Sequence, residues 1–405
     1  IGALRNKSFD EHLTLNPLPL PRELFEIEEP KSIDGLEIFN QRNEKIHSTF
    51  ENSGYYCSFD FREAYLSKKL TPLQACEALI NRIEDSHSIS KLNPTLDCIC
   101  EYRRDDIIAQ ATASTARYEQ DESLGPLDGV PIAIKDELDV QGYETRAGTK
   151  FINRNNPTQK DAFIVKRLRD QGAIIIGKTS MHEIGFDITG NNPNSFTPRN
   201  PHNVKHYSGG SSGGSGCVVA AGLCPIALGC DGGGSIRAPA SFCGIYGLKP
   251  TCGRVSATGE FTLGWSVAVG GPMTSSAEDL ALTYYVIAGK DPEDPRTLHQ
   301  PSPTLHGLYL TDNLSDLKIG IFSAWNKQVT NPAISAAIKT FVDGLKLRGA
   351  EIVDIEIPEL EEARLGHLVT IGLEHAAAVK KYENRHLYTC PNRILLSVTS
   401  NLSTN

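Results

Sequence analysis

Residues 161–176 read DAFIVKRLRDQGAIII, and this stretch contains both kinds of regular structure that decide the fold. Its first part, 161–170, has apolar residues at helical spacing, and Gly172 follows as a helix stop. The run 173–176 is short and wholly apolar, which predicts a strand buried on both faces. Strands and helices alternate in this part of the chain. We therefore expect an α/β fold with helices on the faces of a sheet.

Neighbouring segments extend the same pattern. The run 129–136 reads GVPIAIKD and predicts a short strand that ends in charged residues. Thr71 and Gln74 form a capping box around Pro72, which predicts a helix beginning there. Further helices are expected at 105–119, 277–288 and 332–347, with a strand at 318–322. The Pro- and Glu-rich start of the chain predicts an extended arm with one short helix over residues 1–60. We expect residues 61–405 to form one domain.

Composition excludes several classes of protein. The chain has 405 residues and a net charge of −9, which disfavours a nucleic-acid partner because phosphate binding requires clustered Lys and Arg. The most apolar stretch, 217–230, is too short and too rich in Gly and Pro to cross a membrane. The ten cysteines contain no CxxC pair, which predicts reduced, buried thiols and no zinc site. We expect an intracellular protein, cytoplasmic or peripheral on an internal membrane.

Residues 172–179, GAIIIGKT, match the phosphate-loop pattern GxxxxGK[ST]. A phosphate cradle needs a flexible loop whose N–H groups point inward. The variable positions here are Ala and three Ile, which are stiff and favour a strand. We therefore interpret the match as a buried strand and not as a nucleotide site.

Two serines lie in a glycine-dense region. Ser211 is part of GGSSGGS (209–215), and Ser235 follows three glycines in DGGGSIR (231–237). A serine on such a turn has backbone N–H groups beside its hydroxyl, as an oxyanion hole requires. Lys135 is a candidate base because it closes an apolar strand, where burial favours the neutral amine. From the residues alone, a flexible Gly-Ser linker and a solvated lysine remain open alternatives.

The combination of motifs resembles the amidase signature family. The resemblance rests on GGSSGGS (209–215), DGGGSIRAPA (231–240) and GVPIAIKD (129–136), with GKTSMHE (177–183) and GLKPT (247–251) in support. It covers about residues 70–255. It implies a mixed, twisted β-sheet core covered by helices on both faces, and a Ser/cis-Ser/Lys triad that needs no metal or organic cofactor.

The resemblance also implies a role for each site residue. Ser235 would be the nucleophile, Ser211, after a cis peptide bond, the proton relay, and Lys135 the base. The oxyanion would be held by N–H groups of the glycine turn: Gly232, Gly233, Gly234 and Ser235. Three further residues would support the site by hydrogen bonding: Ser212, Asp231 and Arg237.

Within the family, the chain looks most like the fatty acid amide hydrolase branch of plants and lower eukaryotes. That branch implies hydrolysis of fatty acyl amides such as N-acylethanolamines, with a small-molecule or lipid amide as substrate, and leaves room for peripheral membrane contact and a homodimer. One alternative is a glutaminase of the glutamyl-tRNA amidotransferase A type, working within a complex. Another is a catalytically silent fragment or scaffold, since the part after Ser235 is shorter than is usual in the family and we expect the domain to be incomplete at its C-terminus.

Overall fold

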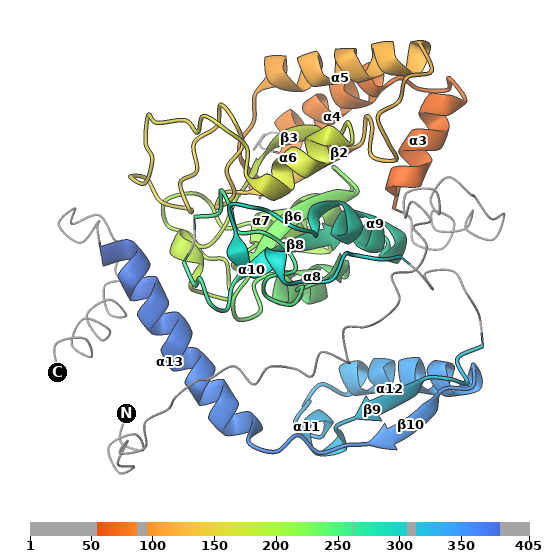
Figure 1. Ribbon diagram of the computed structural model, residues 1–405, viewed down its shortest axis with the longest axis vertical. Helices are drawn as coiled ribbons and strands as arrows, with labels where there is room; N and C mark the ends of the chain where they lie inside the picture. The colour runs from red at the N-terminus through yellow and green to blue at the C-terminus, as the bar shows by residue number, and fades with distance from the viewer. Residues whose placement is uncertain (1–54, 87–94, 262, 306–312, 381–405) are drawn as a thin grey trace. The chain divides into compact units, whose positions relative to one another are not determined.

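The computed structural model describes residues 55–86, 95–261, 263–305 and 313–380 (Figure 1). The chain divides into two units, Ile1–Asp34 and Gly35–Asn405, and all of the described residues belong to the second. The predicted arm over residues 1–60 lies mostly outside the described residues. The division of the chain at residue 60 therefore stays a prediction.

A six-stranded sheet lies at the centre of the fold. Its strand order is β1-β3-β2-β6-β8-β7. The three central strands β3, β2 and β6 are parallel, and β1, β8 and β7 are antiparallel to their neighbours. The strands are β1 (Ile99–Glu101), β2 (Pro131–Lys135), β3 (Ile174–Thr179), β6 (Ile226–Asp231), β7 (Tyr246–Gly247) and β8 (Val269–Thr274). The mixed sheet that the resemblance implies is confirmed.

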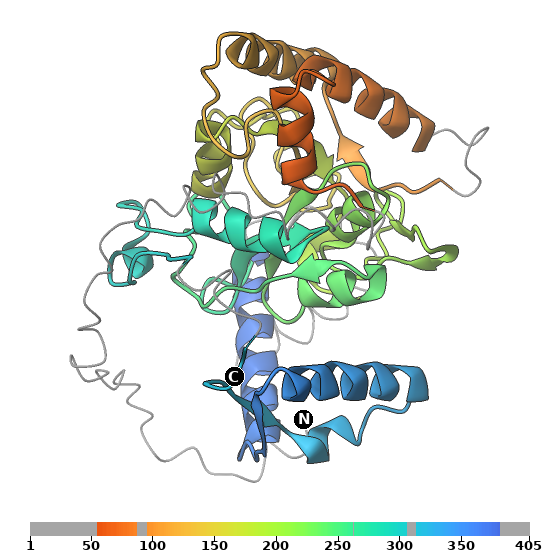
Figure 2. The same ribbon diagram turned by 90° about the vertical axis from the view of Figure 1, so that its right-hand side faces the viewer.

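Helices cover both faces of this sheet, because successive strand residues point to opposite sides. In β2, Ile132 and Ile134 pack in one hydrophobic core, whereas Ala133 packs in the other. The first core contains residues of α6 (Phe163–Asp170) and α9 (Ala277–Ile287). The second contains residues of α4 (Pro72–Ser86), α5 (Arg104–Glu119) and α7 (Gly213–Ala220). Figure 2 shows α9 lying along the strands on its side of the sheet.

The predicted start of helix α4 at Pro72 is confirmed. The Thr71 N–H donates to Gln74 Oε1 at 3.0 Å, and the Gln74 N–H donates to Thr71 Oγ1 at 3.2 Å. This is the reciprocal bonding of a capping box, and it satisfies two N–H groups that a helix start leaves without partners. The prediction for 105–119 is one residue short at its start, since α5 begins at Arg104. The glycine-dense region around Ser211 differs more from the turn or flexible linker that its sequence indicates, because part of it forms helix α7.

The chain after the sheet forms a second, smaller arrangement. Strands β9 (Lys318–Ile321) and β10 (Glu351–Asp354) pair in parallel, and α12 (Pro332–Leu347) connects them. The long helix α13 (Leu360–Val379) follows. The remaining elements are short: α3 (Ser58–Leu66), η4 (Glu183–Gly185), β4 (Arg199–Asn200), β5 (Asn203–Tyr207), α8 (Arg237–Cys243), α10 (Pro295–Leu298) and α11 (Ser323–Asn326).

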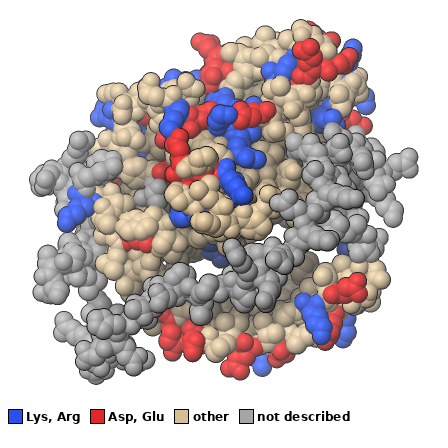
Figure 3. Space-filling view, in the orientation of Figure 1, with Lys and Arg blue, Asp and Glu red and all other residues tan. Residues whose placement is uncertain are grey.

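The described surface shows no separate basic field on the face in Figure 3, where Lys and Arg lie among Asp and Glu. Interleaved charges of this kind do not form the positive stripe that a nucleic-acid backbone requires. Among the described helices, none combines the length and the apolar character that crossing a bilayer demands.

Candidate active site

The predicted site residues meet where two parallel strands end. Lys135 is the last residue of β2, and Asp231 is the last residue of the neighbouring strand β6. Ser211 lies just before α7, and the glycine turn 232–235 leads from β6 into α8. Carboxyl ends of parallel strands are common positions for sites in α/β sheets, because the loops that follow them converge.

Lys135 makes the central contact of the site. Its Nζ donates to Ser211 Oγ at 2.8 Å and to the Cys230 carbonyl oxygen at 3.2 Å. Both Lys135 and Ser211 are 1% exposed, so water hardly competes for this bond. The Gly210–Ser211 peptide bond is cis. The Lys–Ser pair that the resemblance implies is therefore assembled in the structure.

Ser235 lies beside this pair. Its carbonyl oxygen accepts a hydrogen bond from the Ser212 N–H at 3.2 Å, which connects the glycine turn to the start of α7. Ser235 is partly exposed, unlike Ser211. Within the described residues, the Ser235 hydroxyl has no hydrogen bond to Ser211. The structure thus brings the predicted base, Lys135, into contact with the predicted relay, Ser211. It shows no direct hydrogen bond, among the described residues, for proton transfer between the hydroxyls of Ser211 and Ser235.

The glycine turn presents several N–H groups. Among the described residues, the N–H groups of Gly232, Gly233 and Ser235 have no protein acceptor, which leaves them able to bind an oxyanion. The Gly234 N–H differs, because it donates to Asp231 Oδ1 at 2.7 Å. The assignment of Gly234 to the oxyanion hole stays a prediction, because an oxyanion would compete with Asp231 for this N–H group.

Asp231 holds the turn in shape. Its carboxylate accepts from the N–H groups of Gly234 and Ile236 and from the guanidinium of Arg237, at 2.7 to 3.0 Å. Burial alone would raise the pKa of Asp231, but the bonds from Arg237 and from these N–H groups outweigh it and lower that pKa. Asp231 therefore remains a carboxylate, as a supporting residue should.

Ser212 is the third predicted supporting residue. Its hydroxyl donates to the Cys230 carbonyl oxygen at 3.3 Å, the same oxygen that accepts from Lys135. Ser212 is fully buried. It connects the start of α7 to β6 next to the lysine, and these contacts are of the hydrogen-bonding kind that the resemblance implies for Ser212.

Two acidic residues that the sequence analysis did not place in the site lie against Lys135. Glu137 Oε1 is 3.2 Å from Lys135 Nζ, and Glu137 is 5% exposed. Glu260 lies close to Glu137, because a carboxylate oxygen of each residue and the Sγ atom of Cys230 all lie within 4.8 Å of one another. Glu137 follows Lys135 by two residues, so the sequence could have indicated its place in the site by the acidic residue just after the end of β2. Glu260 is distant in sequence and offered none.

Helix α13 also borders the site. The rings of His375 and Phe186 are 5.2 Å apart, and Glu374 Oε2 accepts from the Ser266 N–H at 3.1 Å. A Cβ at Gly232 would lie only 3.0 Å from Ile371 Cδ1, so α13 closely approaches the glycine turn. The sequence analysis did not predict this helix.

His182 lies near the site, and among the described residues it makes no hydrogen bond to a serine hydroxyl. Its backbone N–H donates to the Ser211 carbonyl oxygen at 3.1 Å, and its Nδ1 accepts from the Phe186 N–H at 3.2 Å. Burial lowers the pKa of His182, with Asp187 opposing the shift. The imidazole ring therefore stabilises the loop that follows β3, through its hydrogen bond with the Phe186 N–H.

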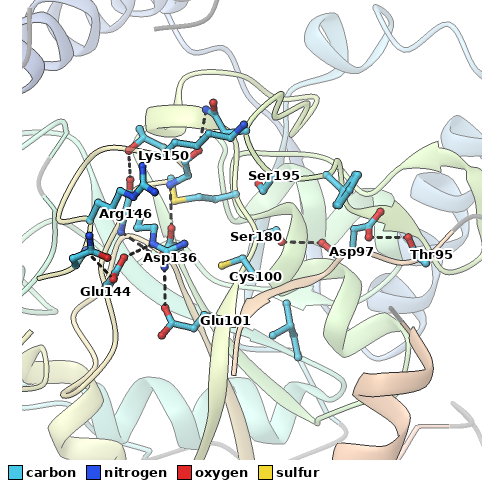
Figure 4. Close-up of a pocket in the computed structure, with 18 residues that line it drawn as sticks. Thr95, Asp97, Cys100, Glu101, Asp136, Glu144, Arg146, Lys150, Ser180 and Ser195 are labelled. Atoms are coloured by element: carbon cyan, nitrogen blue, oxygen red, sulfur yellow. Dashed lines mark hydrogen bonds and ion pairs between the residues drawn. The ribbon is translucent and has the colours of Figure 1, made fainter. Parts of the chain in front are cut away.

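A cavity of about 740 Å³ opens beside the site and is not the site itself. Figure 4 shows its charged and polar lining, which includes Glu101, Asp136, Glu144, Arg146, Lys150 and Ser180. Its described lining includes none of the predicted catalytic, oxyanion or supporting residues.

The phosphate-loop pattern is a buried strand, as predicted. Residues 174–179 form β3, and Lys178 is 0% exposed. Lys178 Nζ lies 3.3 Å from Asp136 Oδ1 and donates to the Glu144 carbonyl oxygen. A lysine engaged in this way does not reach a phosphate group.

Comparisons with known proteins agree with this geometry. Residues 79–403 match the sequence profile of the amidase family. The chain is 40% identical over 336 residues to a fatty acid amide hydrolase from Arabidopsis thaliana, covering 81% of this chain and 54% of that relative. It is 39% identical over 388 residues to a fatty acid amide hydrolase from Medicago truncatula, covering 92% and 63%. The chain thus spans about half to two thirds of the length of these relatives.

Other relatives carry different activities. The A subunit of a glutamyl-tRNA(Gln) amidotransferase from Chloroflexus aurantiacus is 36% identical over 310 residues, covering 76% of this chain and 61% of the relative. Among solved structures, the native peptide amidase from Stenotrophomonas maltophilia aligns with a TM-score of 0.71 and 29% identity, covering 82% of this chain and 68% of that one. Fold, profile and sequence identity agree that the chain belongs to the amidase family.

Proposed function

We propose that the chain carries the catalytic site of a serine-dependent amide hydrolase in which Ser235 attacks, Ser211 relays the proton and Lys135 is the base. The observation that carries the proposal is the buried 2.8 Å contact between Lys135 Nζ and Ser211 Oγ, next to a turn with unbonded N–H groups. A serine hydroxyl is a weak nucleophile, so it needs such a base within hydrogen-bond reach.

The mechanism begins with neutral Lys135 accepting a proton from Ser211, which in turn takes the proton of Ser235. The Ser235 oxygen forms a bond to the amide carbon, and N–H groups of the glycine turn hold the resulting oxyanion. The relay then returns the proton to the nitrogen as the C–N bond breaks and the amine leaves. Water attacks the acyl-enzyme by the same route and releases the acid.

As substrates we propose fatty acyl amides such as N-acylethanolamines. The support is the identity to fatty acid amide hydrolases of about 40%, compared with 36% for the amidotransferase relative. A substrate of this kind fits a protein that is cytoplasmic or peripheral on an internal membrane, and a homodimer remains part of the proposal. The amidotransferase alternative predicts instead that partner proteins co-purify with the chain and that glutamine is hydrolysed.

A fluorophosphonate probe, which reacts with activated serines, tests the proposal directly. We expect the wild-type chain to be labelled, S235A to be unlabelled, and K135A to be labelled about 100-fold or more slowly because it lacks the base. The matched control is S241A, which removes an exposed serine of α8 from the same region. A folded wild-type chain without labelling, or S235A that still labels like S241A, would contradict the proposal and favour a silent scaffold.

A further inference from the structure

We propose that Glu137 is a positioning residue that holds Lys135 as an ammonium directed at Ser211, and that it thereby sets the pH above which the relay operates. The inference deepens the proposed function and rests on it for the role of Lys135. Glu137 itself contacts neither of the two serine hydroxyls by a hydrogen bond within the described residues.

The contacts of Lys135 Nζ match the needs of a charged lysine. An ammonium has three protons to donate. The nitrogen has three acceptors: Ser211 Oγ at 2.8 Å, the Cys230 carbonyl oxygen at 3.2 Å and Glu137 Oε1 at 3.2 Å. A neutral amine could keep all three contacts by accepting the proton of the Ser211 hydroxyl, but it would leave the buried Glu137 carboxylate without a cation. In a site that is 1% exposed at Lys135 and 5% at Glu137, water does not replace it.

Glu260 is the second acid of this cluster and lies beside Glu137. An antiparallel bridge between Leu138 and Glu260 brings the two acids together, and the Phe261 N–H donates to the Glu137 carbonyl oxygen at 2.7 Å. Burial, and then repulsion from Glu137, raise the pKa of Glu260 to about 8. Near pH 7 Glu260 therefore holds a proton and adds no second negative charge beside Glu137 and Lys135.

The other titratable groups around the cluster leave this balance in place. Burial lowers the pKa of His182 and of His375, so both rings are neutral near pH 7. Burial raises the pKa of the Cys230 thiol well above its ordinary value, so it is neutral as well. Arg296 forms a bidentate pair with Asp294, at 2.9 and 2.8 Å, and Glu374 binds Ser266.

A carboxylate in this position has two effects on the reaction. It stabilises the ammonium that forms when Lys135 takes the relayed proton, as the aspartate of a serine triad does for its imidazolium. It also raises the pH that is needed to start with a neutral amine. The expected pH profile thus has an acid limb whose position depends on Glu137.

The experiment compares the pH dependence of kcat/KM for a fatty acyl amide, and of fluorophosphonate labelling, in the wild type, E137Q and E260Q. For E137Q we expect the acid limb to move down by about 1 to 3 pH units, since an opposite charge has been removed, with a lower plateau rate. E260Q replaces a neutral acid by a neutral amide, so its acid limb should coincide with that of the wild type. E137D, which keeps the charge on a shorter side chain, should lie between the wild type and E137Q.

Two results would overturn the proposal. One is an unchanged acid limb in folded E137Q, and the other is an equal shift in E260Q, which would place the charge elsewhere. Circular dichroism and urea unfolding separate these results from simple loss of fold.

A second readout keeps the inference testable in a chain without activity. The 13Cε resonances of labelled lysines report the loss of the Nζ proton, and K135A identifies the resonance of Lys135. We expect this proton to be lost at lower pH in E137Q than in the wild type. Absence of hydrolysis would count against the proposed function alone, whereas an unchanged Lys135 titration in E137Q would count against the role of Glu137.

Discussion

Single residues in this fold tolerate burial in different ways, and Asp279 on α9 illustrates a carboxylate buried without a cation. It is 0% exposed, and among the described residues it forms no ion pair. Its oxygens accept from the Ser58 N–H at 3.0 and 3.2 Å and from the Ser58 hydroxyl. Burial raises its pKa to about 7, and the bonds from Ser58 offset part of the shift. The residue connects the start of α3 to α9.

The pH dependence of stability follows from this shift. The pKa of Asp279 is higher in the folded chain than in the unfolded chain, where it is about 4. Its contribution to stability is therefore complete at low pH and is lost as the pH rises from about 4 to about 7. We expect D279N to gain on the wild type by up to about 1.4 kcal/mol per pH unit across this range.

Urea unfolding of both chains at pH 5, 6, 7 and 8 measures this difference. D279N keeps an oxygen that accepts from Ser58 and cannot ionise, so its own slope with pH should be flatter. A constant difference between the two chains across the four pH values would show that Asp279 is ionised throughout.

At this scale, the sequence predicted the residues that a motif contains and missed those that folding brings in. Lys135, Ser211 and Ser235 were found because each lies in a patterned segment. Glu260 was not found, because its contact with Glu137 depends on a bridge between segments more than 100 residues apart. No local pattern encodes such a pairing.

Among the elements, α7 shows why a helix can be rich in glycine. Its sequence GGSGCVVA has three glycines, which have poor helix propensity. A Cβ at Gly214 would lie 2.5 Å from the Cys98 carbonyl oxygen and from the backbone N and O of Ser180. The helix therefore packs directly on the backbone beside β3, and a side chain at this position would push it away from the site.

We expect G214A to destabilise the chain by about 2 to 3 kcal/mol, because the neighbouring atoms belong to the backbone and cannot move aside. The matched control is G344A in α12, where a Cβ would meet nothing within 4 Å. There alanine should stabilise the helix by about 0.5 to 1 kcal/mol. Urea midpoints of the two variants measure both effects, and similar midpoints would refute the close packing of α7.

Predictability of the elements followed the strength of local signals. The start of α4 was predicted because its capping box lies within four residues. The helix α7 was missed because Gly and Ser favour loops, and close packing overrides that preference. Helix α13 has no capping signal in its sequence, because Glu359 stands at the N-cap position instead of Ser, Thr, Asp or Asn. In the structure Glu359 has a left-handed conformation, with φ at 59°, and its side chain makes no capping hydrogen bond.

The whole molecule combines two cores that share one sheet. Of the nine cysteines in the described residues, seven are buried. Cys57 and Cys230 belong to the core with α6 and α9, whereas Cys76 and Cys217 belong to the core with α4, α5 and α7. Burial raises the pKa of the Cys76 thiol to about 12, which keeps it unreactive in the folded state. These thiols therefore report the opening of each core.

Labelling with N-ethylmaleimide across a urea titration tests whether the cores open together. We expect the four thiols to become reactive with one common midpoint, because β2 and β6 contribute to both cores. Mass spectrometry of the peptides assigns each label. Separate midpoints for the two pairs would mean that one helix layer detaches while the other remains.

The arrangement of layers could be predicted from the sequence, whereas the strand order could not. Alternating strands and helices with apolar runs at 131–135 and 174–176 indicate a sheet buried on both faces. The antiparallel placement of β8 next to β6 depends on long connections, and no local signal in the residues 269–274 indicated a strand.

The strand order also bears on how the chain acquires its fold during synthesis. β2 lies between β3 and β6, and Lys135 is 95 residues from the Cys230 carbonyl oxygen that it binds. A ribosome that adds about 5 to 20 residues per second needs about 5 to 20 s to produce that interval. For this period the central strand of the nascent chain lacks one of its two neighbours, with its edge unpaired. Until β6 has left the ribosome, this edge can pair with a strand of another chain, so the interval between β2 and β6 is the period in which the nascent sheet is most open to aggregation.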